Sequence, residues 1–292
     1  MPIWRPRPAP DRQPPLAVSD LPFRPSPLLP MPPLPPLPDL LVPLAESPHR
    51  SALCLDFDGT LAAIVVDPLA ARPLPGVADL LARLAAHLGL VAVISGRPAS
   101  FLQSVLASPS GVRLIGLYGL EEVGSDGSRI LAPGAAPWEA VITELVALAR
   151  ATAPDGIYVE PKGLTMTLHW RNAPGEADWV SAFVAQQSKA RGLAVHSGRH
   201  ELELRPPLAV DKGTVVRRLV AGFDAVAAFG DDIGDLPAFD ALAELSTSGV
   251  AVARVAAVDA ESPAVVADRA DLVVEGPAGA VALLERLAQA WE

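Results

Sequence analysis

Two aspartates, Asp56 and Asp58, directly follow an apolar run that ends at Leu55, and Gly59 comes right after them. Like charges this close repel, so one is expected to lose its charge unless a cation or a chemical task holds both. At the end of a strand, the first carboxylate can act as a nucleophile that forms an aspartyl-phosphate. The second can donate a proton to the leaving oxygen and later take one from water. The structural alternative is an ordinary Asp-Gly turn.

A second group of aspartates, Asp231, Asp232 and Asp235, follows the apolar run that ends at Gly230. Carboxylates packed this closely are costly unless a divalent ion lies among them, and oxygen-only ligand sets suit Mg²⁺. A magnesium ion would neutralise them together with the first pair and a bound phosphate group. A cap at the start of the next helix is the alternative, and it applies best to Asp235.

Two single residues lie between the acidic groups at comparable strand ends and helix starts. Ser95 follows an apolar run and offers a hydroxyl group to a phosphate oxygen. Lys212 opens an expected helix, where its charge opposes the helix dipole and therefore requires a nearby anion. Taken alone, each is more simply a turn serine or a surface lysine, but their order along the chain favours a phosphate site.

The stretches that carry these residues alternate between strand and helix. Short apolar runs predict buried strands, and apolar residues three or four apart predict helices. Before residue 121 the expected strands are 51–57, 90–95 and 112–118, with helices at 76–88 and from Pro98 onward. After residue 206 we expect a helix at 212–222, strands at 225–232, 249–255 and 271–275, and a closing helix. This order predicts an α/β fold with a Rossmann-like parallel sheet.

The middle of the chain has a different pattern. We expect a helix at 138–150, an alternating stretch at 156–171, a helix at 177–191 and one further alternating strand at 200–206. A period of two is typical of half-exposed antiparallel strands. The order helix, two strands, helix, strand predicts an α+β insertion. Residues 50–120 and 207–292 are therefore the expected core, and residues 121–206 the expected cap domain.

Composition restricts the function classes. Half of the 292 residues are hydrophobic, which is enough for a sizeable core, and the formal net charge is −10. An acidic chain is a poor candidate for nonspecific nucleic-acid binding. The single cysteine, Cys54, cannot form an internal disulfide. No apolar stretch reaches the length of about 18 residues that indicates a membrane span. We therefore expect a cytoplasmic protein without membrane or nucleic-acid partners.

The first 49 residues differ from the rest, because they hold about half of the 32 prolines. Proline lacks an amide donor and fixes φ, so we expect this segment to be extended and largely disordered, without helices or central strands. Two interpretations remain open, a linker and a docking segment for a proline-binding partner protein.

Four short stretches occur in a diagnostic order: "DFDGT", "SGR", "DKG" and "GDDIGD". Together they resemble the haloacid-dehalogenase (HAD) superfamily of phosphohydrolases, with the insertion placed as in members that have a large α/β cap. The stretches "GLYGLE", "VEPKGLTMTLHWR" and "ELELRPPLAVDKG" are similar to trehalose-6-phosphate phosphatases. The resemblance covers residues 51–292 and leaves the first 49 unexplained.

For the core, the resemblance implies that Asp56 is the nucleophile and Asp58 the general acid and base. Asp56, the backbone carbonyl of Asp58, and Asp231 would hold Mg²⁺, and Asp235 would support these ligands. Ser95 and Lys212 would bind the phosphoryl group as catalytic residues, and the loop residues expected beside the substrate are Gly59, Gly96 and Arg97.

For the cap, the resemblance implies that Glu160, Lys162 and Glu203 grip the sugar hydroxyl groups. Glu160 and Lys162 are two apart in an alternating stretch and so share one face. A solvated ion pair on the cap surface is the alternative. His169 and Arg171 match the family pattern, either as substrate contacts or as residues that stabilise the cap.

The resemblance implies a magnesium-dependent phosphoric monoester hydrolase that converts trehalose 6-phosphate to trehalose and phosphate. Other sugar phosphates, such as sucrose 6-phosphate or a mannosyl or glucosyl phosphoglycerate, are alternatives, as are a phosphotransferase and an inactive scaffold that docks through the proline-rich segment. Three positions depart from the family pattern: Gly234 replaces threonine, Leu236 replaces glutamate, and Tyr118 stands where many relatives have histidine. These changes affect the support of the metal and the contacts between core and cap.

Overall fold

The computed structural model describes residues 36–292 except 66, 199 and 261. Of the proline-rich segment 1–49, residues 1–35 therefore lie outside the described part. The expectation of an extended chain is wrong for the rest, because residues Asp39–Leu41 and Pro48–Arg50 form 3-10 turns around helix α1 (Val42–Glu46). Pro43 stands in the first turn of α1, where no amide donor is needed. Leu41 and Leu44 are fully buried, and the Trp291 indole donates a hydrogen bond to the Ala45 carbonyl.

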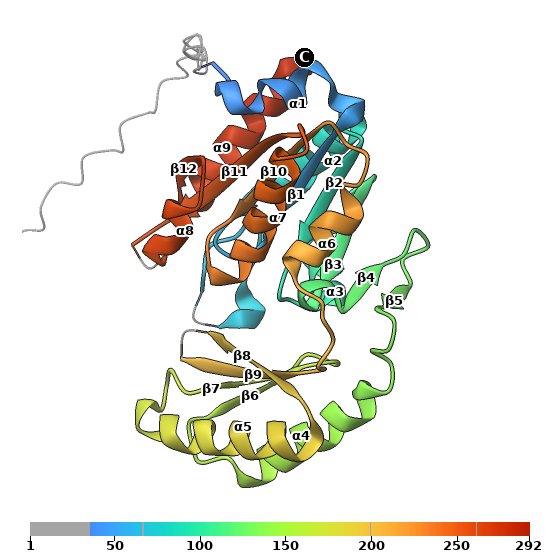
Figure 1. Cartoon of the computed structure of the whole chain (residues 1–292). Helices are drawn as coiled ribbons and strands as arrows, with labels where there is room; N and C mark the ends of the chain where they lie inside the picture. Colours follow the sequence, from blue (N-terminus) through green and yellow to red (C-terminus); the bar gives the residue numbers. More distant parts are fainter. Residues whose placement is uncertain (1–35, 66, 199, 261) are drawn as a thin grey trace, which may run out of the picture. The chain divides into compact units, whose positions relative to one another are not determined.

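The larger sheet has eight strands in the order β12-β11-β10-β1-β2-β3-β4-β5 (Figure 1). Its six parallel strands are β1 (Ser51–Leu55), β2 (Leu90–Ile94), β3 (Val112–Gly116), β10 (Ala225–Gly230), β11 (Ala251–Val258) and β12 (Leu272–Glu275). Every residue of β1 and β10 is buried, as expected for central parallel strands covered on both faces. The expected parallel sheet is confirmed.

Two groups of helices cover the faces of this sheet (Figure 1). One apolar cluster joins it to α1, α2 (Val77–His87), α3 (Ala99–Leu106) and α9 (Gly276–Ala288). The other joins it to α6 (Lys212–Leu219), α7 (Leu236–Ser246) and α8 (Ala264–Asp268). The helices expected from the apolar spacing are thus present, with ends that differ by a few residues.

The register of the parallel strands brings the chemistry-bearing residues to one edge. Leu55 of β1 lies opposite Phe229 of β10 on one side and Val93 of β2 on the other. The residues that follow these strands, Asp56 and Asp231 among them, therefore leave the sheet at the same carboxyl edge, where open α/β sheets bind ligands.

After β3 the chain departs from the expected strand, which was drawn to residue 118. It turns at Leu117 and Tyr118, both with positive φ, of 49° and 58°. An antiparallel hairpin of β4 (Glu121–Val123) and β5 (Arg129–Leu131) then extends the sheet. The core sheet thus runs beyond residue 120, where the sequence placed the end of the first core segment. Strands of three residues are too short to show a period in the sequence.

The insertion forms a second, antiparallel sheet in the order β6-β7-β9-β8, packed against α4 (Trp138–Thr152) and α5 (Ala177–Arg191). Its strands are β6 (Tyr158–Pro161), β7 (Met166–His169), β8 (Ala194–Gly198) and β9 (Glu201–Arg205). We call this unit the cap. The expectation of a single strand after α5 is wrong, since β8 precedes β9. The mixed sequence of β8, which ends in His196, Ser197 and Gly198, gives no clear alternation.

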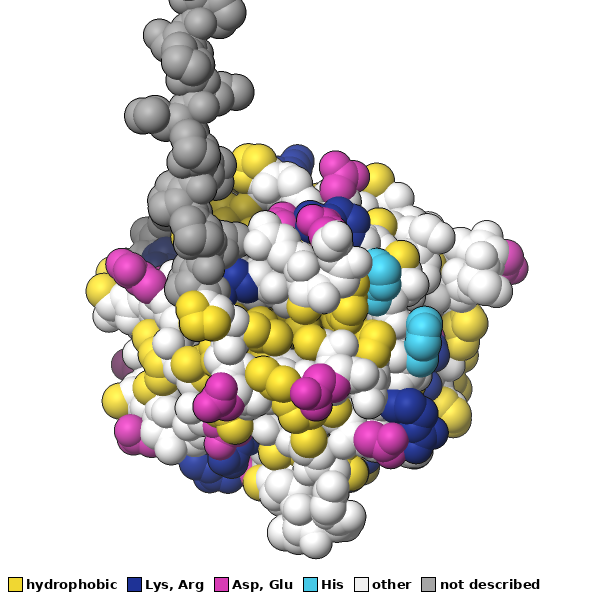
Figure 2. Space-filling view, turned by 90° about the horizontal axis from the view of Figure 1, so that it is seen from above, with side chains coloured by type: hydrophobic (Ala, Val, Ile, Leu, Met, Phe, Trp, Pro, Cys, Tyr) yellow, Lys and Arg dark blue, Asp and Glu magenta, His cyan; other side chains and the backbone are white. Residues whose placement is uncertain are grey.

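The charged side chains can be followed on one face of the molecule. On the face shown in Figure 2, Lys and Arg side chains are scattered among Asp and Glu rather than gathered into a basic patch. Among the helices of the described part, none combines the length and the apolar character that a membrane span needs.

Candidate active site

A buried lysine joins two of the predicted aspartates. Lys212 Nζ donates to Asp56 Oδ1 and, at 2.6 Å, to Asp235 Oδ1. All three side chains are almost inaccessible to solvent. Burial alone would lower the pKa of Lys212, but Asp235 and Asp56 raise it well above its ordinary value. Lys212 is therefore a permanent cation beside the expected nucleophile, and the alternative of a surface lysine is wrong.

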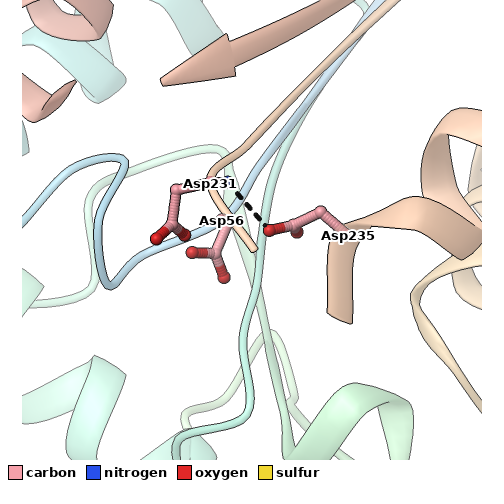
Figure 3. Close-up of side chains that lie close together, drawn as sticks. All are labelled: Asp56, Asp231 and Asp235. Carbon is pink, nitrogen blue, oxygen red and sulfur yellow. Dashed lines mark hydrogen bonds between the residues drawn. The ribbon is translucent and has the colours of Figure 1, made fainter. Parts of the chain in front are cut away.

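Asp231 completes the acidic group at the strand ends. Its carboxylate lies next to that of Asp56, while Asp235 approaches from the other side (Figure 3). One oxygen of each of these three aspartates lies within 4.8 Å of the others. Asp235 Oδ2 accepts hydrogen bonds from the backbone amides of Asp231, at 3.0 Å, and Asp232, at 3.3 Å. Asp235 is thus committed to Lys212 and the backbone.

The electrostatics of this group fit a divalent cation. Burial, followed by the charge of Asp56, raises the pKa of Asp231 to about 10. Burial also raises the pKa of Asp56 well above its ordinary value, although Lys212 opposes that shift. One lysine is too little positive charge for three buried carboxylates, and oxygen ligands of this kind suit Mg²⁺.

Gly59 makes room for Asp231. A Cβ atom at Gly59 would lie 2.0 Å from Asp231 Oδ2, and the backbone there has a φ of +77°. Both conditions exclude a side chain. The glycine that was predicted as a substrate-binding residue thus shapes the carboxylate site itself.

Asp58 is not one of the three aspartates whose oxygens converge, and it pairs with Arg97. The Arg97 Nε atom lies 2.7 Å from Asp58 Oδ2, and Nη2 lies 2.7 Å from Oδ1. Arg97 was predicted to bind substrate, whereas the structure shows it holding the expected general acid.

Ser95 Oγ is buried at the end of β2 and accepts a hydrogen bond from the Arg97 amide at 3.1 Å. Gly96 lies against Tyr118, since a Cβ there would lie 2.7 Å from the phenol oxygen.

On the cap, a row of polar residues crosses three strands. Thr167 of β7 lies opposite Glu160 of β6 and Glu203 of β9. Lys162 Nζ lies 3.7 Å from Glu160 Oε2 and 4.0 Å from Glu203 Oε2. The Thr167 hydroxyl and Glu203 Oε1 are buried and have no hydrogen-bond partner among the described residues. Buried polar atoms normally have partners, so these two are available to a bound water or a polar ligand.

Comparison with known proteins identifies the family. The sequence model of the family described as trehalose-phosphatase matches residues 54–272. The chain belongs to this family. It is 35% identical over 255 residues to the trehalose-phosphate phosphatase of Mycobacterium avium, covering 84% of this chain and 63% of that protein. It is 36% identical over 214 residues to the one of Mycobacterium marinum, covering 70% of this chain and 53% of that protein. The chain therefore spans between half and two thirds of the length of these relatives.

Solved structures agree on the fold of this trehalose-phosphatase family member. The C-terminal domain of Candida albicans trehalose-6-phosphate phosphatase matches with a TM-score of 0.69 at 22% identity, over 87% of this chain and 98% of that one. A trehalose-6-phosphate phosphatase related protein matches with the same TM-score at 20% identity, over 82% and 97%. The predicted HAD-type α/β fold is thereby confirmed.

Contacts also connect core and cap in this family member. The rings of Tyr118 and His196 lie 5.2 Å apart, and the Arg205 guanidinium carbon lies 5.3 Å from the Tyr118 ring centre. A cavity of about 540 Å³ is lined by core residues, which include Arg97, and by cap residues, which include Glu160. Glu160 of the polar row thus lines the same cavity as the residue that holds Asp58.

Sequence reasoning missed several residues of this region. Neither Thr167 nor Glu201 was singled out from the sequence. Arg171 and His169 line a second cavity, of about 280 Å³, together with Tyr158. The signal for Glu201 was present in the same alternating stretch as Glu203, because residues two apart on a strand share a face.

Proposed function

We propose that this protein is a magnesium-dependent phosphatase that hydrolyses trehalose 6-phosphate to trehalose and inorganic phosphate. The observation that carries the proposal is the convergence of Asp56, Asp231 and Lys212 at one sheet edge. It is supported by a cavity that Glu160 of the cap row lines together with Arg97, the partner of Asp58. Membership of the trehalose-phosphatase family and the names of the curated relatives support the choice of substrate.

In this proposal Asp56 is the nucleophile. Its carboxylate attacks phosphorus, and the bond from phosphorus to the sugar oxygen breaks. Asp58 gives its proton to that oxygen, so the sugar leaves as an alcohol. Asp58 then takes a proton from the water that attacks the aspartyl-phosphate, and phosphate leaves while Asp56 is restored.

The remaining core residues would bind the phosphoryl group and the metal ion. Ser95 and Lys212 would hold the phosphoryl oxygens, because they offer a hydroxyl group and a fixed cation. Asp56, Asp231 and the backbone carbonyl of Asp58 would hold Mg²⁺. The bound ion supplies charge neutralisation between the carboxylates and the phosphate dianion.

The cap is the proposed sugar-binding surface. A disaccharide is neutral and rich in hydroxyl groups, so it is recognised by hydrogen bonds, which charged partners strengthen. Glu160, Lys162 and Glu203 offer such charged partners. The unpartnered Thr167 hydroxyl and Glu203 Oε1 would gain partners when the sugar binds. A cytoplasmic location belongs to the same proposal. Docking through residues 1–49 stays a prediction.

Phosphate release by the purified chain tests the proposal. We expect release from trehalose 6-phosphate that depends on Mg²⁺, that exceeds release from sucrose 6-phosphate, and that disappears in Asp56→Asn. Replacing Glu160 or Lys162 by alanine should weaken turnover of trehalose 6-phosphate but leave turnover of p-nitrophenyl phosphate, which has no sugar, unchanged. Equal turnover of all sugar phosphates would refute the assigned substrate, and activity in Asp56→Asn would refute the mechanism.

A further inference from the structure

His169 has a carboxylate at each of its two ring nitrogens. Its Nε2 atom lies 2.8 Å from Glu160 Oε2, and its Nδ1 atom lies 3.0 Å from Glu201 Oε2. The three residues come from different strands, since Glu160 is on β6, His169 on β7 and Glu201 on β9. His169 lies directly opposite Glu201, and Glu160 is its diagonal neighbour. His169 therefore links the end of the cap row to a carboxylate outside it.

This arrangement requires the doubly protonated ring. A neutral imidazole has one N–H donor and one acceptor, so it would direct a lone pair at one of the two carboxylates. The imidazolium donates to both. Burial would lower the pKa of His169, but the hydrogen bonds that the ring donates to Glu160 and Glu201 outweigh burial and raise the pKa to about 8.

The other charged and titratable groups around His169 are few. On β6, Tyr158 places its ring 5.5 Å from the His169 ring. Lys162 Nζ lies 3.7 Å from Glu160 Oε2, the same oxygen that faces His169 Nε2. Arg171 and Asp67 line the same cavity as His169. Burial would raise the pKa of Glu160, yet His169 and Lys162 lower it, so Glu160 stays an anion.

We propose that His169 is a positioning residue, which as an imidazolium anchored on Glu201 fixes the Glu160 carboxylate for the sugar and makes substrate affinity depend on pH. This inference rests on the proposed function, because it assigns Glu160 to the sugar. His169 itself does not touch the substrate in this scheme. When the ring loses a proton, it can donate to only one carboxylate, and Glu160 loses its fixed orientation.

The pH dependence of KM and kcat distinguishes a positioning role of His169 from a purely structural one. For the wild type we expect KM for trehalose 6-phosphate to rise as pH passes about 8, while kcat follows the core residues. Below that pH, His169→Gln should raise KM by roughly tenfold, because one charge-assisted hydrogen bond is lost. In this variant KM should not rise further as pH passes about 8. Turnover of p-nitrophenyl phosphate should be unchanged in this variant. His49→Gln, an exposed histidine on the core, is the matched control and should behave as the wild type.

Glu201→Gln gives the second variant. With one carboxylate removed, the pKa of His169 should fall, so the rise of KM should move to lower pH. A direct NMR titration of the His169 ring in the ligand-free wild type and in Glu201→Gln measures the same shift without turnover, and it applies even if His169→Gln does not fold. A wild type that does not cleave trehalose 6-phosphate would refute the proposed function. An identical pH profile of KM in wild type and His169→Gln, or a His169 pKa that does not fall in Glu201→Gln, would refute this inference alone.

Discussion

Arg97 donates two parallel hydrogen bonds to Asp58, from Nε to Oδ2 and from Nη2 to Oδ1, each 2.7 Å long. A third bond, from Arg97 Nη1 to the Pro68 carbonyl at 2.7 Å, anchors the guanidinium to the segment that follows the aspartates. The planar guanidinium fits a carboxylate in this way, whereas an ammonium group does not. The proposed acid is thus oriented by the loop after the neighbouring strand β2.

The first prediction concerns this pair. Arg97→Lys keeps a positive charge but loses the fork, and we expect kcat for trehalose 6-phosphate to fall by about tenfold to a hundredfold, because a misplaced acid transfers its proton poorly. KM should change less. Arg254→Lys is the matched control, since Arg254 holds Asp271 in the same two-bonded geometry, at 2.9 Å and 2.5 Å, on β11. A fall in kcat of similar size in both variants would contradict the role given to Arg97.

The second prediction concerns the space beside Asp231. Gly59→Ala would place a methyl group 2.0 Å from the Asp231 carboxylate, at a φ of +77°. We expect phosphatase activity to fall by at least about a hundredfold, because the carboxylate must move by an ångström or so. Gly222→Ala is the control, with a φ of +90° and no atom within 4 Å of the added Cβ. Each variant should lose about 1–2 kcal/mol of stability from the left-handed backbone, but only Gly59→Ala should lose activity. Full activity in Gly59→Ala would contradict the prediction, because it would show that the Asp231 carboxylate can shift without loss of catalysis.

The sequence was sufficient for the parts of the site that depend on strand ends. Asp56, Ser95 and Asp231 each follow an apolar run, and parallel strands bring such ends to one edge whatever the loops do. The Arg97–Asp58 pair could not be predicted in the same way, because it depends on how two loops fold toward each other. The bridge from His169 to Glu201 requires the register between β7 and β9, and a helix and a further strand separate these in the chain.

Two parts of the fold escaped prediction for different physical reasons. The hairpin of β4 and β5 is formed from strands of three residues, which show no period. The segment from Asp39 to Glu46 was assigned to the proline-rich extension by composition alone. Composition cannot show that Leu41 and Leu44 fit against the core, because burial depends on the surface that receives them.

The third prediction concerns the cation. In the protein without metal, burial and Asp56 raise the pKa of Asp231 to about 10, so this carboxyl holds a proton at neutral pH. A metal ion binds the deprotonated form, so Mg²⁺ must displace that proton. We expect binding to release at least about one proton near pH 7, and affinity to increase as pH rises toward the pKa. Calorimetric titration in two buffers with different ionisation enthalpies measures the release.

Asp231→Asn should lose both the proton release and the binding. Asp79→Asn, which changes an exposed aspartate in the first turn of α2, should keep both. Magnesium binding with no proton release at neutral pH would mean that Asp231 is either ionised beforehand or not a ligand.

The last prediction tests the packing of the segment before β1. Leu44 in α1 is fully buried, whereas Leu40, four residues earlier, is 41% exposed. Leu44→Ala should lower the free energy of unfolding by about 2–5 kcal/mol, because it removes buried methyl groups and leaves a cavity. Leu40→Ala should change it by about 0.5 kcal/mol or less, as surface substitutions do. Unfolding in urea, followed by Trp fluorescence, compares the two. Equal small losses of unfolding free energy would mean that residues 39–46 are a dispensable extension, as the composition of the first 49 residues suggested. A large loss in Leu44→Ala alone would make these residues part of the core on which the strand ends of the active site depend.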